Sequence, residues 1–183
     1  MTAVVQNIKK DSLADLAGIK KGDILLSVNK ECDFDILYYR FLTNSKKVIL
    51  RVQKKSGDID ELEIVNDNYE DLGITFAKEL IDSPKSCKNK CIFCFVDQLP
   101  KGMRKTLYFK DDDYRLSMLT GSYITLTNLT EKDIHRIIQM HLPRVNISVH
   151  STDIQIRSAM LNSDNVDVMS VMKRFAKAKI LMN

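Results

Sequence analysis

The sequence predicts a two-part α/β chain, in which a small, mostly-β module precedes a module of alternating strands and helices. Residues 1–77 hold several short apolar stretches separated by turn residues, a pattern typical of short strands. In residues 78–183, strand and helix patterns alternate at the spacing of a parallel sheet or barrel. The chain is 44% hydrophobic and 28% charged, a composition that excludes collagen-like and largely disordered classes.

The first module is predicted from apolar segments and from two helix starts. Strands are expected at residues 4–8, 24–28, 48–52 and 62–65. Ser12 is expected to begin a short helix over 13–16 that ends at Gly18. Either Asp33 or Asp35 is expected to begin a second helix.

The second module is predicted from strands at 123–128 and 145–150, a third strand starting at Ile180, and helices over 134–142 and 168–176. In the 145–150 strand the apolar residues share one face, and Asn146, Ser148 and His150 share the other. In a barrel this polar face would line the interior, where active sites lie. The alternative is an edge strand with its polar face exposed to solvent.

Three of the four cysteines, Cys87, Cys91 and Cys94, fall within eight residues, and Cys32 lies far from them. An odd, tight cluster indicates a metal or catalytic site rather than a disulfide framework. Three thiolates on one loop suit three irons of a 4Fe–4S cluster and leave the fourth iron open. Zinc also accepts thiolates, so the spacing alone leaves the metal undecided.

The segment around these cysteines is basic, and an acidic run follows it. Residues 85–110 hold seven Lys and Arg against a single Asp97. These cations could offset the charge of a cluster, attract a nucleic acid or phosphorylated substrate, or form a solvated loop. The run 111–113 could bind a cation or substrate, or begin a helix. Arg115 could bind a carboxylate, or form an ion pair with this run.

The segment SLADLAGIKKGDILLSVN in the first half resembles PDZ domains of the bacterial protease type. The resemblance implies that Asp71-Leu72-Gly73-Ile74 is a carboxylate-binding loop, whose backbone N–H groups would hold a peptide C-terminus. The alternative is a module that packs on its neighbour and binds no peptide. A peptide-binding module with a structural zinc or an electron-transfer iron–sulfur site is therefore the rival hypothesis for the whole chain.

The spacing C-x3-C-x2-C, with Phe93 before the last cysteine, resembles the signature of radical S-adenosylmethionine (SAM) enzymes. The longer stretch CKNKCIFCFVDQLPKGMRKTLYFKDDDYRLSMLTGSYITLTNLT resembles bacterial proteins that join a PDZ-like domain, a radical-SAM-like domain and a C-terminal domain of unknown function. The resemblance implies a partial (β/α) barrel, a 4Fe–4S cluster on the three cysteines, and SAM as cofactor. It further implies reductive SAM cleavage to a 5′-deoxyadenosyl radical, with a flavodoxin- or ferredoxin-like protein as electron donor.

The cofactor residues that the resemblance implies follow from position. Phe93 is expected near the SAM adenine, and Ser148 and His150 on the inner face are further candidates. The Gly-Gly-Glu type motif of many radical SAM enzymes is replaced by TLTN, so Thr127 and Asn128 are candidates by position. Because family members continue beyond this length, we expect a PDZ-like domain at 1–77 and a truncated barrel at 78–183 that is inactive by itself. The absence of a signal-like or membrane-spanning stretch favours the cytoplasm.

Overall fold

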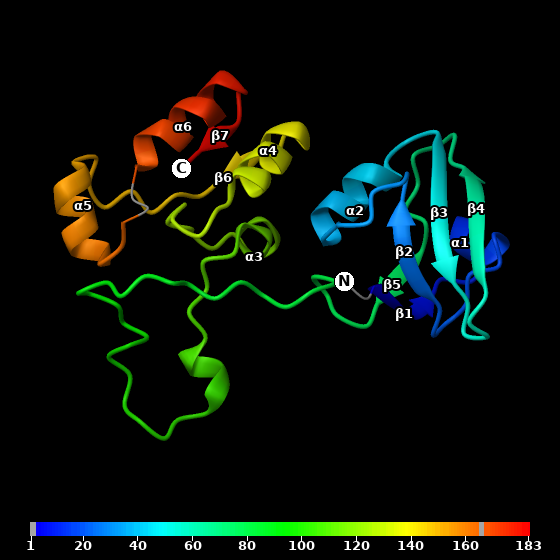
Figure 1. Cartoon of the computed structure of the whole chain (residues 1–183), viewed down its shortest axis with the longest axis horizontal. Helices are drawn as coiled ribbons and strands as arrows, with labels where there is room; N and C mark the ends of the chain where they lie inside the picture. Colours follow the sequence, from blue (N-terminus) through cyan, green and yellow to red (C-terminus); the bar gives the residue numbers. More distant parts are fainter. Residues whose placement is uncertain (1–2, 165–166) are drawn as a thin grey trace. The chain divides into compact units, whose positions relative to one another are not determined.

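The computed structural model describes residues 3–164 and 167–183, which belong to two compact units, Met1–Ser83 and Pro84–Asn183 (Figure 1). The division falls later in the chain than the boundary predicted after residue 77. No helix in the described ranges is long and apolar enough to cross a membrane.

The first unit is built on an antiparallel sheet with the strand order β4-β3-β2-β1-β5. Its strands are β1 (Ala3–Ile8), β2 (Ile24–Val28), β3 (Lys47–Gln53), β4 (Ile59–Val65) and β5 (Ile74–Phe76). In β3 the apolar residues Val48, Leu50 and Val52 are buried, as the alternation of a half-buried strand requires. The four strands expected from the sequence are confirmed.

Both predicted helices of this unit begin at a capping side chain. Ser12 accepts the Asp15 N–H at the start of α1 (Leu13–Leu16). Asp35, rather than Asp33, begins α2 (Ile36–Thr43), and its Oδ1 accepts the N–H groups of Leu37 and Tyr38 at 2.9 Å. These bonds satisfy backbone donors that have no partner within the helix.

The fifth strand, β5, is not predicted from the sequence, and its first residue, Ile74, is the last residue of the expected carboxylate-binding loop. Gly73 precedes this strand with φ +84°, and a Cβ at this position would collide with the Ser12 side chain. Its N–H donates to Asp71 Oδ1 at 2.7 Å, and its carbonyl accepts the Lys9 N–H. The structure thus requires glycine at this position, and peptide binding by this loop stays a prediction.

The second unit contains more helix than the sequence predicted. Its elements are a 3₁₀ helix η1 (Lys105–Tyr108), α3 (Tyr114–Thr120), α4 (Glu131–Gln139), β6 (Arg144–Val145), α5 (Ile154–Leu161), α6 (Val168–Lys177) and β7 (Leu181–Met182). Asp113 begins α3, as one reading of the acidic run predicted, and Thr130 and Asp133 form a capping box at α4. The helices η1 and α5 were not predicted.

The expected parallel pairing is present, but the predicted strands at 123–128 and 145–150 are wrong in extent. β6 pairs with β7 in parallel, and Ile124 forms an isolated parallel bridge with Ile147. Beyond these pairs, side chains replace strand neighbours as backbone partners. Asp112 accepts the Thr125 N–H at 2.6 Å, and Arg157 donates to the carbonyl of Val149 at 2.8 Å. The partial barrel therefore stays a prediction.

Candidate functional site

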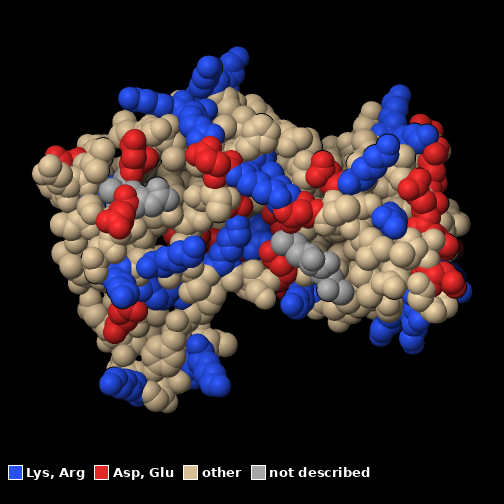
Figure 2. Space-filling view, in the orientation of Figure 1, with Lys and Arg blue, Asp and Glu red and all other residues tan. Residues whose placement is uncertain are grey.

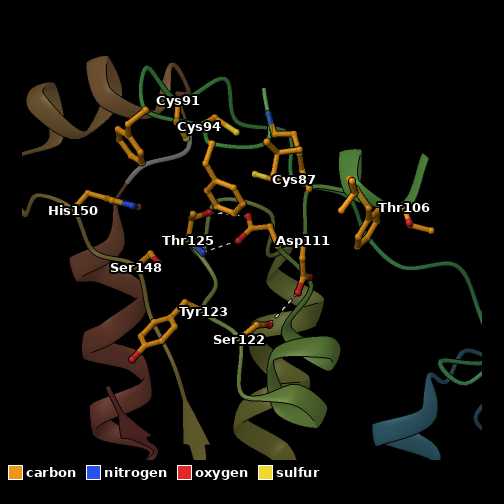
Figure 3. Close-up of a pocket in the computed structure, with 17 residues that line it drawn as sticks. Cys87, Cys91, Cys94, Thr106, Asp111, Ser122, Tyr123, Thr125, Ser148 and His150 are labelled. Atoms are coloured by element: carbon orange, nitrogen blue, oxygen red, sulfur yellow. Dashed lines mark hydrogen bonds between the residues drawn. The ribbon is translucent and has the colours of Figure 1, made fainter. Parts of the chain in front are cut away.

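A pocket of about 520 Å³ lies in the second unit, and the three clustered cysteines form part of its wall (Figure 3). Four segments that are distant in sequence contribute to it. The first segment supplies Cys87, Cys91 and residues 93–96, and the second supplies Thr106, Leu107 and residues 109–112. The third supplies Ser122, Tyr123 and Thr125, and the fourth supplies Ser148 and His150. The pocket thus combines thiols, aromatic rings and carboxylates in one place.

The thiols of Cys87, Cys91 and Cys94 lie along one edge of the pocket, on one loop (Figure 3). All three are free, and a turn closed by the Cys94 N–H on the Cys91 carbonyl, at 3.1 Å, joins the last two. Burial raises the pKa of Cys87 to about 11. Burial and then the neighbouring Cys94 raise the pKa of Cys91. The Cys87 and Cys91 thiols of the metal-free chain are therefore protonated at neutral pH.

The loop is held from inside by Asn89, midway between the first two cysteines. This side chain is 2% exposed; it donates to Thr125 Oγ1 at 3.1 Å and accepts from the Thr127 hydroxyl at 3.0 Å. From outside, the end of α5 holds the loop, because the carbonyls of Leu161 and Met160 each accept one loop N–H at 3.0 Å. These bonds fix the backbone that carries the thiols.

The acidic run 111–113 divides between the pocket and the fold. Asp111 and Asp112 line the pocket, and Asp111 Oδ2 accepts the Ser122 hydroxyl at 3.0 Å. Burial raises the pKa of Asp112, although its bonds with Thr125 oppose the change. Asp113 instead begins α3 and forms a buried ion pair with Arg115, N to O 2.6 Å. The ion pair predicted for Arg115 is confirmed.

The structure brings together three of the five predicted cofactor residues. Phe93, Ser148 and His150 line the pocket, and the Phe93 and His150 rings lie 5.1 Å apart between centroids. Burial, followed by the charge of Arg157, lowers the pKa of His150. This ring is therefore neutral at physiological pH.

Thr127 and Asn128 do not line this pocket. Thr127 bonds Asn89, as described above, and so supports the cysteine loop. Asn128 Nδ2 donates to the Ser86 carbonyl at 2.8 Å, while its buried Oδ1 has no hydrogen-bond partner among the described residues. Both side chains therefore contact the segment that carries the cysteines, Thr127 at Asn89 and Asn128 at Ser86.

Several residues that shape the site were not singled out from the sequence. Asn89 and Thr125 are ordinary polar residues within longer runs, so their pairing across 36 positions left no local signal. Arg157, 1% exposed, donates to the carbonyls of Thr125 and Val149 from within an unpredicted helix. In this helix the basic Arg157 is buried, whereas the apolar Ile154 and Ile156 are exposed. This is the reverse of the amphipathic pattern by which helices are predicted.

The basic segment 85–110 divides into paired and unpaired cations. Lys85 pairs with Asp133, and Lys110 with Asp97, each at 2.7 Å. Five others have no ion pair among the described residues: Lys88, Lys90, Lys101, Arg104 and Lys105. Figure 2 shows Lys and Arg side chains outnumbering Asp and Glu on the visible face where this segment lies. The segment that carries the cysteines thus has an excess of positive charge.

The donor set suits an iron–sulfur cluster. Three thiols of one loop face a common pocket, and such clusters are held by cysteine thiolates. Within the described part of the chain, no three His, Cys, Asp or Glu side chains are already grouped closely enough to hold a metal ion. The three thiols therefore fit the group by their donor chemistry and by their place on one pocket wall.

Comparison with known families agrees with both resemblances read from the sequence. A PDZ domain model matches residues 4–54, and a radical SAM-like domain model matches residues 66–183. A search of curated proteins gave no match. Because the second match covers more than half of the sequence and contains the whole cysteine pocket, the chain belongs to the radical SAM-like domain family.

Proposed function

We propose that this chain holds a [4Fe–4S] cluster on Cys87, Cys91 and Cys94 and serves in the reductive cleavage of SAM. The observation that supports the proposal best is the placement of these three thiols on the wall of a single pocket in a radical SAM-like domain. Three protein ligands leave one iron of such a cluster open to a small molecule.

The chemistry supplied by a bound, reduced cluster would be one electron to the sulfonium of SAM, giving methionine and a 5′-deoxyadenosyl radical. The chain's own residues bind and orient. The Phe93 and His150 rings offer an aromatic wall to the adenine. Asp111 and Asp112 place carboxylates in the same pocket, where they would attract the positively charged groups of SAM. A flavodoxin- or ferredoxin-like protein would supply the electron.

The proposal is tested by anaerobic reconstitution of the full chain with iron and sulfide, followed by electron spin resonance of the reduced protein with and without SAM. We expect an iron–sulfur signal that SAM changes, and no such signal in Cys91→Ala. The variant Lys88→Ala, in the same loop and exposed, is the matched control and is expected to behave as the native chain. A protein that retains only zinc, or a cluster whose signal ignores SAM, would contradict the proposal.

A further inference from the structure

We propose that Lys110 is a positioning residue that holds both ends of the cysteine loop and supplies a fixed positive charge to its three sulfurs. This inference rests on the proposed function for the identity of the metal group, but its geometry is independent of it. Of the seven basic residues in 85–110, Lys110 is the one that lines the pocket.

The ammonium group of Lys110 joins two points on either side of the last two cysteines. Its Nζ donates to the Asn89 carbonyl at 2.8 Å and to Asp97 Oδ2 at 2.7 Å. Asn89 precedes Cys91, and Asp97 follows Cys94. One side chain therefore bridges the segment that carries these two thiols.

The backbone of the same residue holds the first cysteine. The Lys110 carbonyl accepts the Cys87 N–H at 2.7 Å and the Ser86 hydroxyl at 3.3 Å. Asp111, the next residue, forms an antiparallel bridge with Ser86. Main chain and side chain of Lys110 together thus contact the loop before, within and after the three cysteines.

The charge of Lys110 is retained in this position. The ammonium group donates to the Asp97 carboxylate at 2.7 Å, and this charged partner stabilises its protonated form. The side chain is 18% exposed, so its field is screened by water less than that of the exposed lysines nearby. A cation on the wall of the same pocket offsets thiolate charge and raises the reduction potential of a bound cluster.

The test compares Lys110→Met, which removes the bonds and the charge, with Lys110→Arg, which keeps the charge. Lys105→Met removes an exposed charge from the same segment and is the matched control. The first probe is Co²⁺ alone, titrated into the metal-free chain and followed by its thiolate absorption. We expect Lys110→Met to bind Co²⁺ about 10- to 100-fold more weakly than the native chain, and Lys105→Met to bind it equally well.

The second readout is the reduction potential of the reconstituted cluster. If Lys110 only supported the fold, its replacement would not change this potential. We expect a more negative potential in Lys110→Met and a potential near the native one in Lys110→Arg. Equal Co²⁺ affinity and equal potential in Lys110→Met and the native chain would overturn the inference. If the native chain binds Co²⁺ but assembles no iron cluster, the proposed function fails, whereas the Co²⁺ comparison still decides the role of Lys110.

A further variant keeps the inference testable if Lys110→Met does not fold. Asp97→Asn weakens one acceptor of the Lys110 ammonium at an exposed position. We expect weaker Co²⁺ binding in Asp97→Asn with an unchanged melting temperature. Native Co²⁺ affinity in this variant would contradict the bridge between Asn89 and Asp97.

Discussion

The side-chain amide of Asn89 donates to the Thr125 hydroxyl at 3.1 Å. The same hydroxyl donates to Asp112 Oδ2 at 2.7 Å. This chain of bonds connects the middle of the cysteine loop to the buried part of the acidic run across the wall of the pocket. The loop geometry therefore depends on residues that hold no metal.

Replacement of Asn89 by alanine should loosen the loop without removing a ligand. The Thr125 and Thr127 hydroxyls lose a buried partner, which costs about 1–3 kcal/mol. Metal affinity should fall by about 10- to 100-fold. Urea denaturation and Co²⁺ titration measure the two effects. The exposed Lys88→Ala serves as control, and native values of both quantities in Asn89→Ala would refute the anchoring role.

Replacement of Asp113 by asparagine should destabilise the second unit by about 3–5 kcal/mol, because it leaves the Arg115 guanidinium buried with a neutral partner. Burial raises the pKa of Asp113, but bonds from Arg115 and from the Lys85 and Arg115 N–H groups outweigh it, so the pKa is lowered. The ion pair therefore stabilises the fold above about pH 4, the ordinary range of aspartate, and loses its effect as the pH falls below it.

The measurement is thermal unfolding of native and Asp113→Asn chains between about pH 3 and 6. The difference in stability between them should shrink toward acid pH. A difference that stays constant across this range would show that the carboxylate charge is not responsible.

Metal binding should strengthen steeply with pH. Burial raises the pKa of Cys87 to about 11 and also raises that of Cys91, so both protons must leave before the thiolates bind. Loss of these two protons alone contributes about a 100-fold gain in Co²⁺ affinity for each pH unit below these pKa values. Titrations at two pH values with matched buffers measure the slope. A slope near zero would mean that these thiols are already ionised or do not bind the metal.

Removal of the Phe93 ring should weaken SAM binding to the reconstituted protein by about tenfold, since stacking of a base on an aromatic ring contributes about 1–3 kcal/mol. The neighbouring Ile92 is 75% exposed and does not line the pocket, so Ile92→Ala is the matched control. Calorimetric titration gives both affinities. Equal losses in the two variants would exclude a specific contact between Phe93 and the adenine.

Local signals in the sequence were sufficient for the first unit. Alternating apolar residues and capping side chains identified four of its strands and both helices, because each signal lies within a few residues of the element that it specifies. The exception is β5, whose three residues follow a glycine and pair with β1 across more than sixty positions. A strand this short has no periodicity of its own.

For the candidate site, local signals in the sequence identified only part of the arrangement. The cysteine spacing and the ring of Phe93 are local features, and both were identified. The residues that support the cysteine loop are not local: Asn89 bonds Thr125, and Arg157 donates to the carbonyl of Thr125 from an unpredicted helix. The strands predicted at 123–128 and 145–150 are shorter in the structure for the same reason, because buried Asp112 and Arg157 side chains take backbone groups that a sheet would otherwise pair.

We propose above that the three clustered cysteines hold an iron–sulfur cluster. The most direct measurement is the iron and sulfide content of the anaerobically reconstituted chain, native and with Cys87, Cys91 or Cys94 changed singly to alanine. We expect about four irons per native chain, with visible absorption that is lost or strongly reduced in each variant. A native chain without sulfide, or variants with the full native iron content, would contradict it.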